Sequence, residues 1–113
     1  MTGPSAGFVY IWTYTVKAQY QAEFERAYGP DGEWAQFFSH SPDYLGTDLI
    51  QDVANPLRYL TLDHWTTQAA RDTYRHANQV TFTQIDERCE HLTESETLIG
   101  DFISTLQISQ NMI

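Results

Sequence analysis

The hydrophobic pattern of the chain begins with a run of nine uncharged residues, Phe8 to Val16. Aromatic and β-branched side chains dominate this run, which favours a strand over a helix. Side chains alternate between the faces of a strand, so one face would carry Phe8, Tyr10, Trp12, Tyr14 and Val16, and the other Val9, Ile11, Thr13 and Thr15. Neither face carries a charge, so we expect both faces of this strand to be covered.

Beyond this strand, the spacing of apolar residues switches between the helical period and the strand period. Helical spacing predicts a helix over residues 18–28, a short helix over 33–38, and further helices over 68–78 and 80–92. Looser alternation predicts strands over residues 44–53, 58–65 and 96–105. Glycine and proline within 29–32 end the first helix, and turns at 41–43 and 54–56 flank the second strand.

This order of elements is the ferredoxin-like βαββαβ pattern, which predicts an α+β fold with a four-stranded antiparallel sheet. Right-handed crossovers put both helical segments on one face of that sheet. The other face would be bare, although the first and third strands have apolar residues on both faces. We therefore expect a homodimer in which two sheet faces pack together into a dimeric α+β barrel. Its interface should reach the standard size of roughly 1,600 Å².

The length of 113 residues corresponds to one domain with a single core. We place this domain at residues 8–105, with a flexible leader over 1–7 and a C-terminal tail over 106–113 that frays or swaps. No apolar run reaches the roughly 20 residues that span a bilayer, and the leader lacks the regions of a signal peptide. The single cysteine, Cys89, excludes an internal disulfide. We expect a cytoplasmic protein.

The charge of the chain is strongly acidic. Fifteen acidic residues against six scattered basic ones give a net charge of −9. No basic stripe is available to neutralise a run of phosphates, so we expect no nucleic acid and no membrane among the partners.

Five motifs follow one another along the chain: Trp12-x-Tyr14-x-Val16, a run from Glu23 to Trp34, Tyr44-Leu45-Gly46-Thr47-Asp48-Leu49, Leu62-Asp63-His64-Trp65 and Ile99-Gly100-Asp101-Phe102. In this order and spacing they resemble the antibiotic biosynthesis monooxygenase domain family of the dimeric α+β barrel superfamily, over about residues 8–103. The resemblance implies a small cofactor-independent monooxygenase acting on an aromatic, quinol or polyketide-type molecule. The superfamily hosts several unrelated reactions, so a non-enzymatic dimer that binds a small apolar or aromatic ligand is the alternative.

A ligand pocket in this architecture would lie between the sheet and the helices, and its walls would be mostly aromatic. The candidates for substrate contact are Trp12, Tyr14, Tyr28, Trp34 and Trp65. Each of them could instead be part of an ordinary core. A buried tyrosine hydroxyl needs a polar partner or a cavity, which favours a site role more for tyrosine than for tryptophan.

Oxygenation without a cofactor needs a substrate that donates an electron to dioxygen, a base, and donors for the resulting oxyanion. His64 is the first candidate for the base, because histidine titrates near neutrality. Strand alternation puts His64 and Trp65 on opposite faces, so only one of them can reach a given pocket. Tyr74 and Asp86 are the other catalytic candidates, and Asp86 could instead pair with Arg75 or Arg88.

We expect no metal and no other cofactor. The pair His91-x-x-Glu94 lacks a third ligand at a suitable spacing. The haem-degrading enzymes of the superfamily have an asparagine on the first strand, which is absent here, and Tyr74 stands near the position of their tryptophan. No phosphate-binding loop, flavin fingerprint or nucleophile elbow is present.

Overall fold

The computed structural model describes residues 7–105 of the chain. The strands are β1 (Phe8–Val16), β2 (Tyr44–Gln51), β3 (Arg58–Trp65) and β4 (Thr93–Ile103). The helices are α1 (Gln21–Tyr28), α2 (Glu33–Phe38), α3 (Gln68–Ala77) and α4 (Gln79–Cys89). Short 3₁₀ helices at Ala18–Tyr20 and Glu90–Leu92 precede α1 and follow α4. The element order confirms the predicted βαββαβ pattern.

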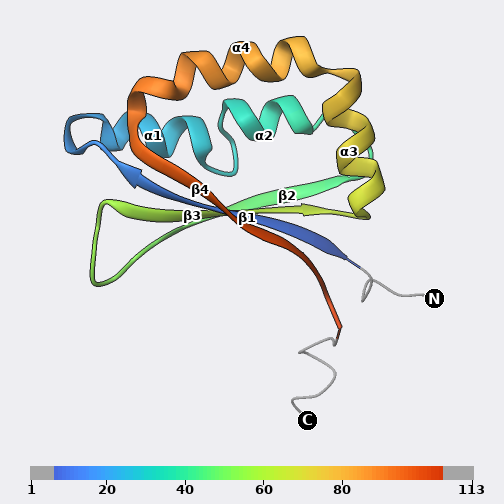
Figure 1. Cartoon of the computed structure of the whole chain (residues 1–113), viewed down its shortest axis with the longest axis horizontal. Helices are drawn as coiled ribbons and strands as arrows, with labels where there is room; N and C mark the ends of the chain where they lie inside the picture. Colours follow the sequence, from blue (N-terminus) through green and yellow to red (C-terminus); the bar gives the residue numbers. More distant parts are fainter. Residues whose placement is uncertain (1–6, 106–113) are drawn as a thin grey trace.

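The strands form one antiparallel sheet in the order β2-β3-β1-β4, and the helices all lie on one side of it (Figure 1). This arrangement confirms the predicted α+β fold, with its crossovers on a single face. The sheet of one chain is not closed into a barrel, so the dimeric barrel remains a prediction. The leader up to residue 6 and the tail 106–113 lie outside the described residues.

Some boundaries differ from those predicted, and local polar groups explain the differences. β2 ends at Gln51 rather than 53, because the Asp52 carboxylate accepts hydrogen bonds from the backbone N–H groups of Ala54 and Asn55 and closes the turn. α3 ends one residue earlier than predicted, where Asn78 leaves the helical conformation. β4 begins at Thr93 rather than 96. Its first residues, Thr93 to Ser95, are polar and show no alternating apolar pattern. An edge strand can form without such a pattern, so the sequence did not predict this part.

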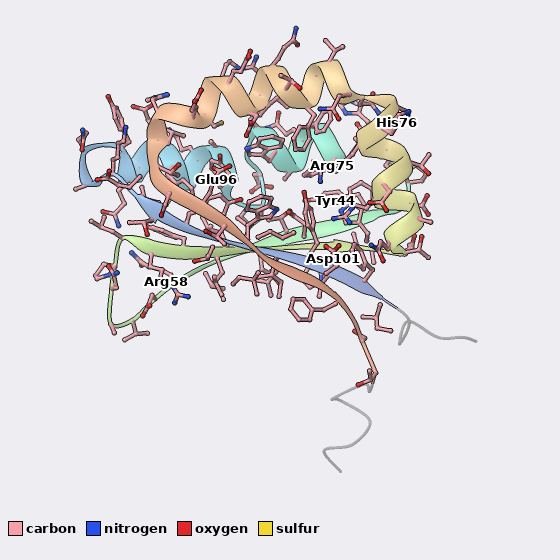
Figure 2. The ribbon with its side chains drawn as sticks, viewed as in Figure 1. Tyr44, Arg58, Arg75, His76, Glu96 and Asp101 are labelled. Atoms are coloured by element: carbon pink, nitrogen blue, oxygen red, sulfur yellow. The ribbon has the colours of Figure 1, made fainter. Side chains whose placement is uncertain are left out.

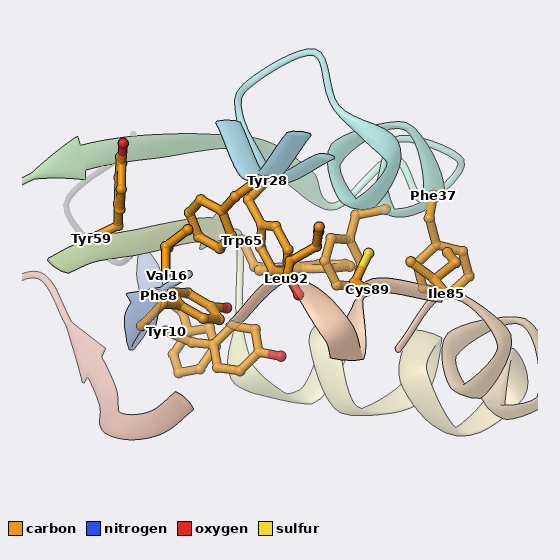
Figure 3. Packing of buried hydrophobic residues seen from close by; sticks show 13 residues of the cluster. Phe8, Tyr10, Val16, Tyr28, Phe37, Tyr59, Trp65, Ile85, Cys89 and Leu92 are labelled. Atoms are coloured by element: carbon orange, nitrogen blue, oxygen red, sulfur yellow. The ribbon is translucent and has the colours of Figure 1, made fainter. Parts of the chain in front are cut away.

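The hydrophobic core lies between the sheet and the helices. Alternate residues of β1 and β3 face the helices, and Phe8, Trp65 and Tyr59 among them are almost fully buried. Figure 3 shows how aromatic rings and aliphatic side chains from the strands and helices interlock around Trp65 and Leu92. Aromatic rings dominate this core, so its shape depends on how large flat side chains fit together.

Gly46 sits at a β-bulge in β2 that changes which residues of the strand face inward. Tyr44 pairs with Trp65 and Gly46 with His64, so Leu45 is an additional residue in the ladder. Gly46 has a φ of 131°, a conformation that side chains with a Cβ rarely adopt. As a result Thr47 lies opposite Asp63 on the helix-covered face.

The other face of the sheet, which we call the open face, has no helix over it (Figure 1). It carries Val9, Ile11, Leu60, Leu62, Ile50 and Phe102. Ile50 is 48% exposed and Phe102 is 44% exposed.

Among the helices of residues 7–105, none is long and apolar enough to cross a membrane.

Candidate active site

A cavity opens between the helix-covered face of the sheet and the helices α1, α2 and α4, and we call it the central cavity. It is lined by Tyr10, Trp12, Tyr14, Tyr28, Trp34, Phe38, Thr47, Thr61, Asp63, Phe82, Asp86 and Glu96. Its volume is about 50 Å³, room for a few water molecules and less than the ~150 Å³ that accepts benzene. Trp12, Trp34 and Phe82 are only partly buried, so a ring-sized ligand would enter by displacing them.

Asp63 is the buried carboxyl group of the central cavity. It lies near the middle of the helix-covered face, opposite Tyr10 of β1 and Thr47 of β2, and is only 7% exposed. The hydroxyl of Thr47 donates a hydrogen bond to one carboxylate oxygen, Oδ1, at 2.5 Å. Tyr44 in turn contacts the same Thr47 hydroxyl. Within the described part of the chain, the second oxygen of Asp63 has no hydrogen-bond partner, which leaves it free for a ligand.

Burial raises the pKa of Asp63 to about 6, because the charged form loses its hydration. The Thr47 hydrogen bond and the more distant charges of His64 and Arg71 oppose this rise. Arg71 cannot neutralise the carboxylate by direct contact, since its guanidinium pairs with Asp72 and Asp101. Asp63 can therefore exchange a proton close to neutral pH, as a general base must.

The tyrosines of the central cavity are neutral donors. Burial raises the pKa of both Tyr14 and Tyr28 well above the ordinary value for a phenol. The Tyr14 hydroxyl lies 3.3 Å from the hydroxyl of Thr61. Both tyrosines keep their protons at physiological pH, so they can donate hydrogen bonds to an anionic ligand atom but cannot act as bases.

Trp34 contributes its aromatic ring to the same cavity. Its indole N–H is buried, and none of residues 7–105 accepts a hydrogen bond from it. The ring packs against Phe38, Phe82 and Tyr28. The buried N–H lies close to Tyr28 and Cys89 rather than at the cavity surface.

Asp86 and Glu96, which we call the acidic rim, stand at one end of the central cavity. Glu96 on β4 lies opposite Tyr14, and Asp86 comes from α4. Both residues are exposed to solvent. Partial desolvation, together with the negative charges of Asp86 and Glu90, raises the pKa of Glu96. Figure 2 shows Glu96 toward one end of the space between sheet and helices and Arg75 toward the other.

Solved structures share this arrangement of sheet, helices and chain order. SnoaB from Streptomyces nogalater, a cofactor-independent oxygenase solved as a point mutant, is 19% identical to this chain. It superimposes with a TM-score of 0.71 over 91% of this chain and 97% of SnoaB. A proposed antibiotic biosynthesis monooxygenase from Bordetella bronchiseptica is 17% identical, with a TM-score of 0.69 over 89% and 99% of the two chains. The chain has the fold of the antibiotic biosynthesis monooxygenases.

The same monooxygenase fold also occurs in MhuD, which was solved with two manganese protoporphyrin IX molecules per active site. MhuD is 22% identical, with a TM-score of 0.69 over 89% of this chain and 97% of its own. By sequence, no family model and no curated protein matches the chain. Residues 7–105 contain no group of three or more His, Cys, Asp or Glu side chains that could hold a metal ion.

Five of the eight residues predicted for the site line the central cavity, namely Trp12, Tyr14, Tyr28, Trp34 and Asp86. The structure does not bring the other three to it. His64 lies on the open face, where its Nε2 is 3.1 Å from Asp48. Trp65 is fully buried among core rings, and Tyr74 donates its hydroxyl to the Phe37 carbonyl at 2.5 Å. Their catalytic or binding roles would need a different cavity.

Asp63 is the site residue that the sequence interpretation missed. Strand alternation already pairs it with Thr61 and Trp65 rather than with His64. A carboxylate among inward-facing residues of a strand is rare enough to mark a site, because an unpaired buried charge is costly. His64 is the more suitable base by residue type, but it lies on the face of β3 that the helices do not cover.

Proposed function

We propose that this chain is a small cofactor-independent monooxygenase that acts on an aromatic, quinol or polyketide-type molecule in the central cavity. The observation that carries the proposal is Asp63, a buried carboxyl group with a pKa of about 6 in an aromatic cavity. A base of this kind can deprotonate a phenol or an enol at neutral pH. The fold shared with SnoaB supports the same reading.

The reaction would begin when the free oxygen of Asp63 takes the proton of a bound phenol or enol. The resulting anion is electron-rich enough to reduce dioxygen without a metal or flavin. The anion would add dioxygen at carbon to give a peroxide, which takes back the proton from Asp63. The O–O bond of this hydroperoxide would then break together with the C–H bond on the same carbon, so that one oxygen stays as a carbonyl and the other leaves as water with both hydrogens. The substrate supplies all the electrons, so the step balances without a further reductant.

Neutral donors around the cavity would stabilise the substrate anion. The Tyr14 hydroxyl stays protonated and lies 3.3 Å from the hydroxyl of Thr61, which is on the same face of β3 as Asp63. Such donors stabilise developing charge most strongly where water is excluded. The aromatic walls would keep water away from the oxygen intermediate.

The proposed active form is a homodimer joined through the open face. Val9, Ile11, Leu60 and Leu62 form an apolar centre on this face, without a helix to cover it. A second copy is the simplest cover, because the same apolar strip on two chains is self-complementary. Pairing of the two sheets would leave the helices outside and complete the predicted barrel.

The test is oxygen uptake in air with a panel of hydroquinones and anthrones. We expect uptake by the unaltered protein to rise with pH through about 6, as Asp63 loses its proton. Asp63→Asn should lower the rate about a hundredfold to ten-thousandfold, the usual contribution of a general base. His64→Ala is the matched control, because His64 is the next residue on β3 but lies on the open face.

Two results would overturn this assignment. Uptake that is unchanged in Asp63→Asn would exclude Asp63 as the base. Binding of the panel without any oxygen uptake would favour the alternative function, a dimer that shelters a small aromatic ligand. The small volume of the central cavity is compatible with either function, because a ligand must displace aromatic rings to enter in both cases.

A further inference from the structure

The carboxyl groups of the central cavity lie beside two different positions of β1. Asp63 lies opposite Tyr10, and Glu96 lies opposite Tyr14 on the same face. Four residues along a strand correspond to roughly 13 Å. The base and the acidic rim therefore stand at two separate positions, with Trp12 between them.

The acidic rim has no counter-charge among the described residues. Neither Asp86 nor Glu96 forms an ion pair or a side-chain hydrogen bond there. Arg88, although it is on the same helix as Asp86, is paired with Glu33. The nearby carboxylate of Glu90 adds to the negative charge around Glu96.

Arg71 stacks over the wall residue Tyr10 at 4.3 Å from the ring centre. Arg75 stands behind another wall residue and does not itself line the cavity. Its guanidinium stacks over the ring of Phe82 at 4.3 Å from the ring centre. Figure 2 shows it at the end away from Glu96. The cavity thus has two carboxylates at one end and, at the other, the Asp63 carboxyl with the guanidinium groups of Arg71 and Arg75 behind the walls. The two ends differ in charge, so the cavity would orient a polar ligand.

Four aromatic side chains in successive contact line the cavity together with the acidic rim. The ring centres of Trp12 and Tyr14 are 6.4 Å apart, those of Tyr14 and Tyr28 are 5.0 Å apart, and those of Tyr28 and Trp34 are 6.2 Å apart. The faces of such rings attract cations, and walls of several rings are the usual recognition site of ammonium groups. Carboxylates at the edge of the rings strengthen this attraction.

We propose that the substrate of this site carries a protonated amine or a quaternary ammonium group, which binds between the acidic rim and the rings of Trp12, Tyr14, Tyr28 and Trp34. The proposal rests on the proposed function, since it names the substrate class of the same cavity. The reactive hydroxyl of the substrate would then point toward Asp63. Anionic aromatic acids would be disfavoured.

The experiment compares two probes of the same shape by titration of tryptophan fluorescence at low ionic strength. One probe is the para-hydroxyphenethyl trimethylammonium ion, and the other is its neutral isostere with a tert-butyl group in place of the trimethylammonium group. We expect the cation to bind about two- to fivefold more tightly, which is the scale of a cation–π contact at a site whose carboxylates are exposed. Glu96→Gln and Asp86→Asn should remove most of this difference and leave the affinity for the neutral probe unchanged.

Glu94→Gln and Glu87→Gln are matched controls, because they remove the same charge from the same elements without altering the cavity lining. Circular dichroism confirms that each variant is folded. Equal affinity for the two probes, absence of binding by both, or a preference that persists in the rim variants would overturn the proposal. A preference for the cation without oxygen uptake would overturn the oxygenase function and leave the ligand class standing.

Discussion

At the scale of single residues, Asp63 shows how one position can set the chemistry of a cavity. A carboxyl group that is 7% exposed and has one side-chain hydrogen bond loses most of its hydration. Loss of hydration disfavours the ionised form, which is why its pKa rises to about 6. The same burial must cost stability when Asp63 ionises.

The pH dependence of stability follows from this shift. The folded-state pKa of Asp63 lies above the unfolded value of 3.8, so the folded protein is most favoured when Asp63 is protonated. Relative to Asp63→Asn, the unaltered protein should lose about 2–3 kcal/mol of unfolding free energy as the pH rises from about 4 to above 6. Urea denaturation of both proteins at several pH values measures this difference.

Thr47→Val provides a companion variant for the same measurement. Removal of the hydroxyl that donates to Asp63 should raise the pKa further and move the loss of stability to higher pH. A difference between the unaltered protein and Asp63→Asn that stays constant with pH would contradict the buried-carboxyl interpretation.

At the scale of elements, the bulge in β2 determines which residues reach the cavity. One extra residue in a strand exchanges its two faces beyond that point. Without the additional residue Leu45, Thr47 would point to the open face and Asp63 would lose its hydrogen-bond donor. The positive φ of Gly46 holds the bulge in place.

Gly46→Ala tests this role of the bulge. A Cβ at Gly46 meets no atom within 4 Å, so the expected cost comes from the backbone conformation alone. We expect a loss of about 1–3 kcal/mol of unfolding free energy, measured by thermal or urea denaturation. The oxygen-uptake rate should fall as well, because Thr47 would no longer hold Asp63. Unchanged stability would show that the bulge tolerates another backbone conformation.

At the scale of the whole molecule, only one of the two faces of the sheet is covered in the single chain. Helices bury one face of the sheet, and the open face leaves Ile50 and Phe102 nearly half exposed. An apolar surface of this kind lowers its free energy by pairing. The proposal of a dimer therefore rests on the exposed apolar side chains of the open face and not on the cavity.

Leu62→Lys should break the proposed dimer. A lysine in the centre of the open face would place a charge against its own copy in the partner chain, so sedimentation at micromolar concentration should change from a dimer to a monomer. Val53→Lys is the control, because Val53 is fully exposed in the turn after β2 and should leave the dimer intact. A monomeric unaltered protein would contradict the dimer outright.

The sequence predicted the helices and strands best where apolar residues recur at a clear helical or strand spacing. β1, β3 and α2 have the predicted boundaries, since their apolar residues recur without interruption. The aromatic walls of the cavity were also predicted, because Trp12, Tyr14, Tyr28 and Trp34 come from these elements or their neighbour α1. The position of Asp63 in the cavity was not predicted, because residue type alone does not tell which face of β3 the helices cover.

The sequence by itself determined the order of strands and helices, the acidic charge and the supply of aromatic rings, because local period and composition are properties of neighbouring residues. Only the tertiary structure decided which face of the sheet the helices cover. That choice buries Asp63 and leaves His64 on the opposite face. It also brings Glu96 next to Asp86. These contacts join residues that are far apart in the sequence. Burial in such contacts removes water from the carboxyl groups and raises their pKa values, and the pattern of neighbouring residues does not show this.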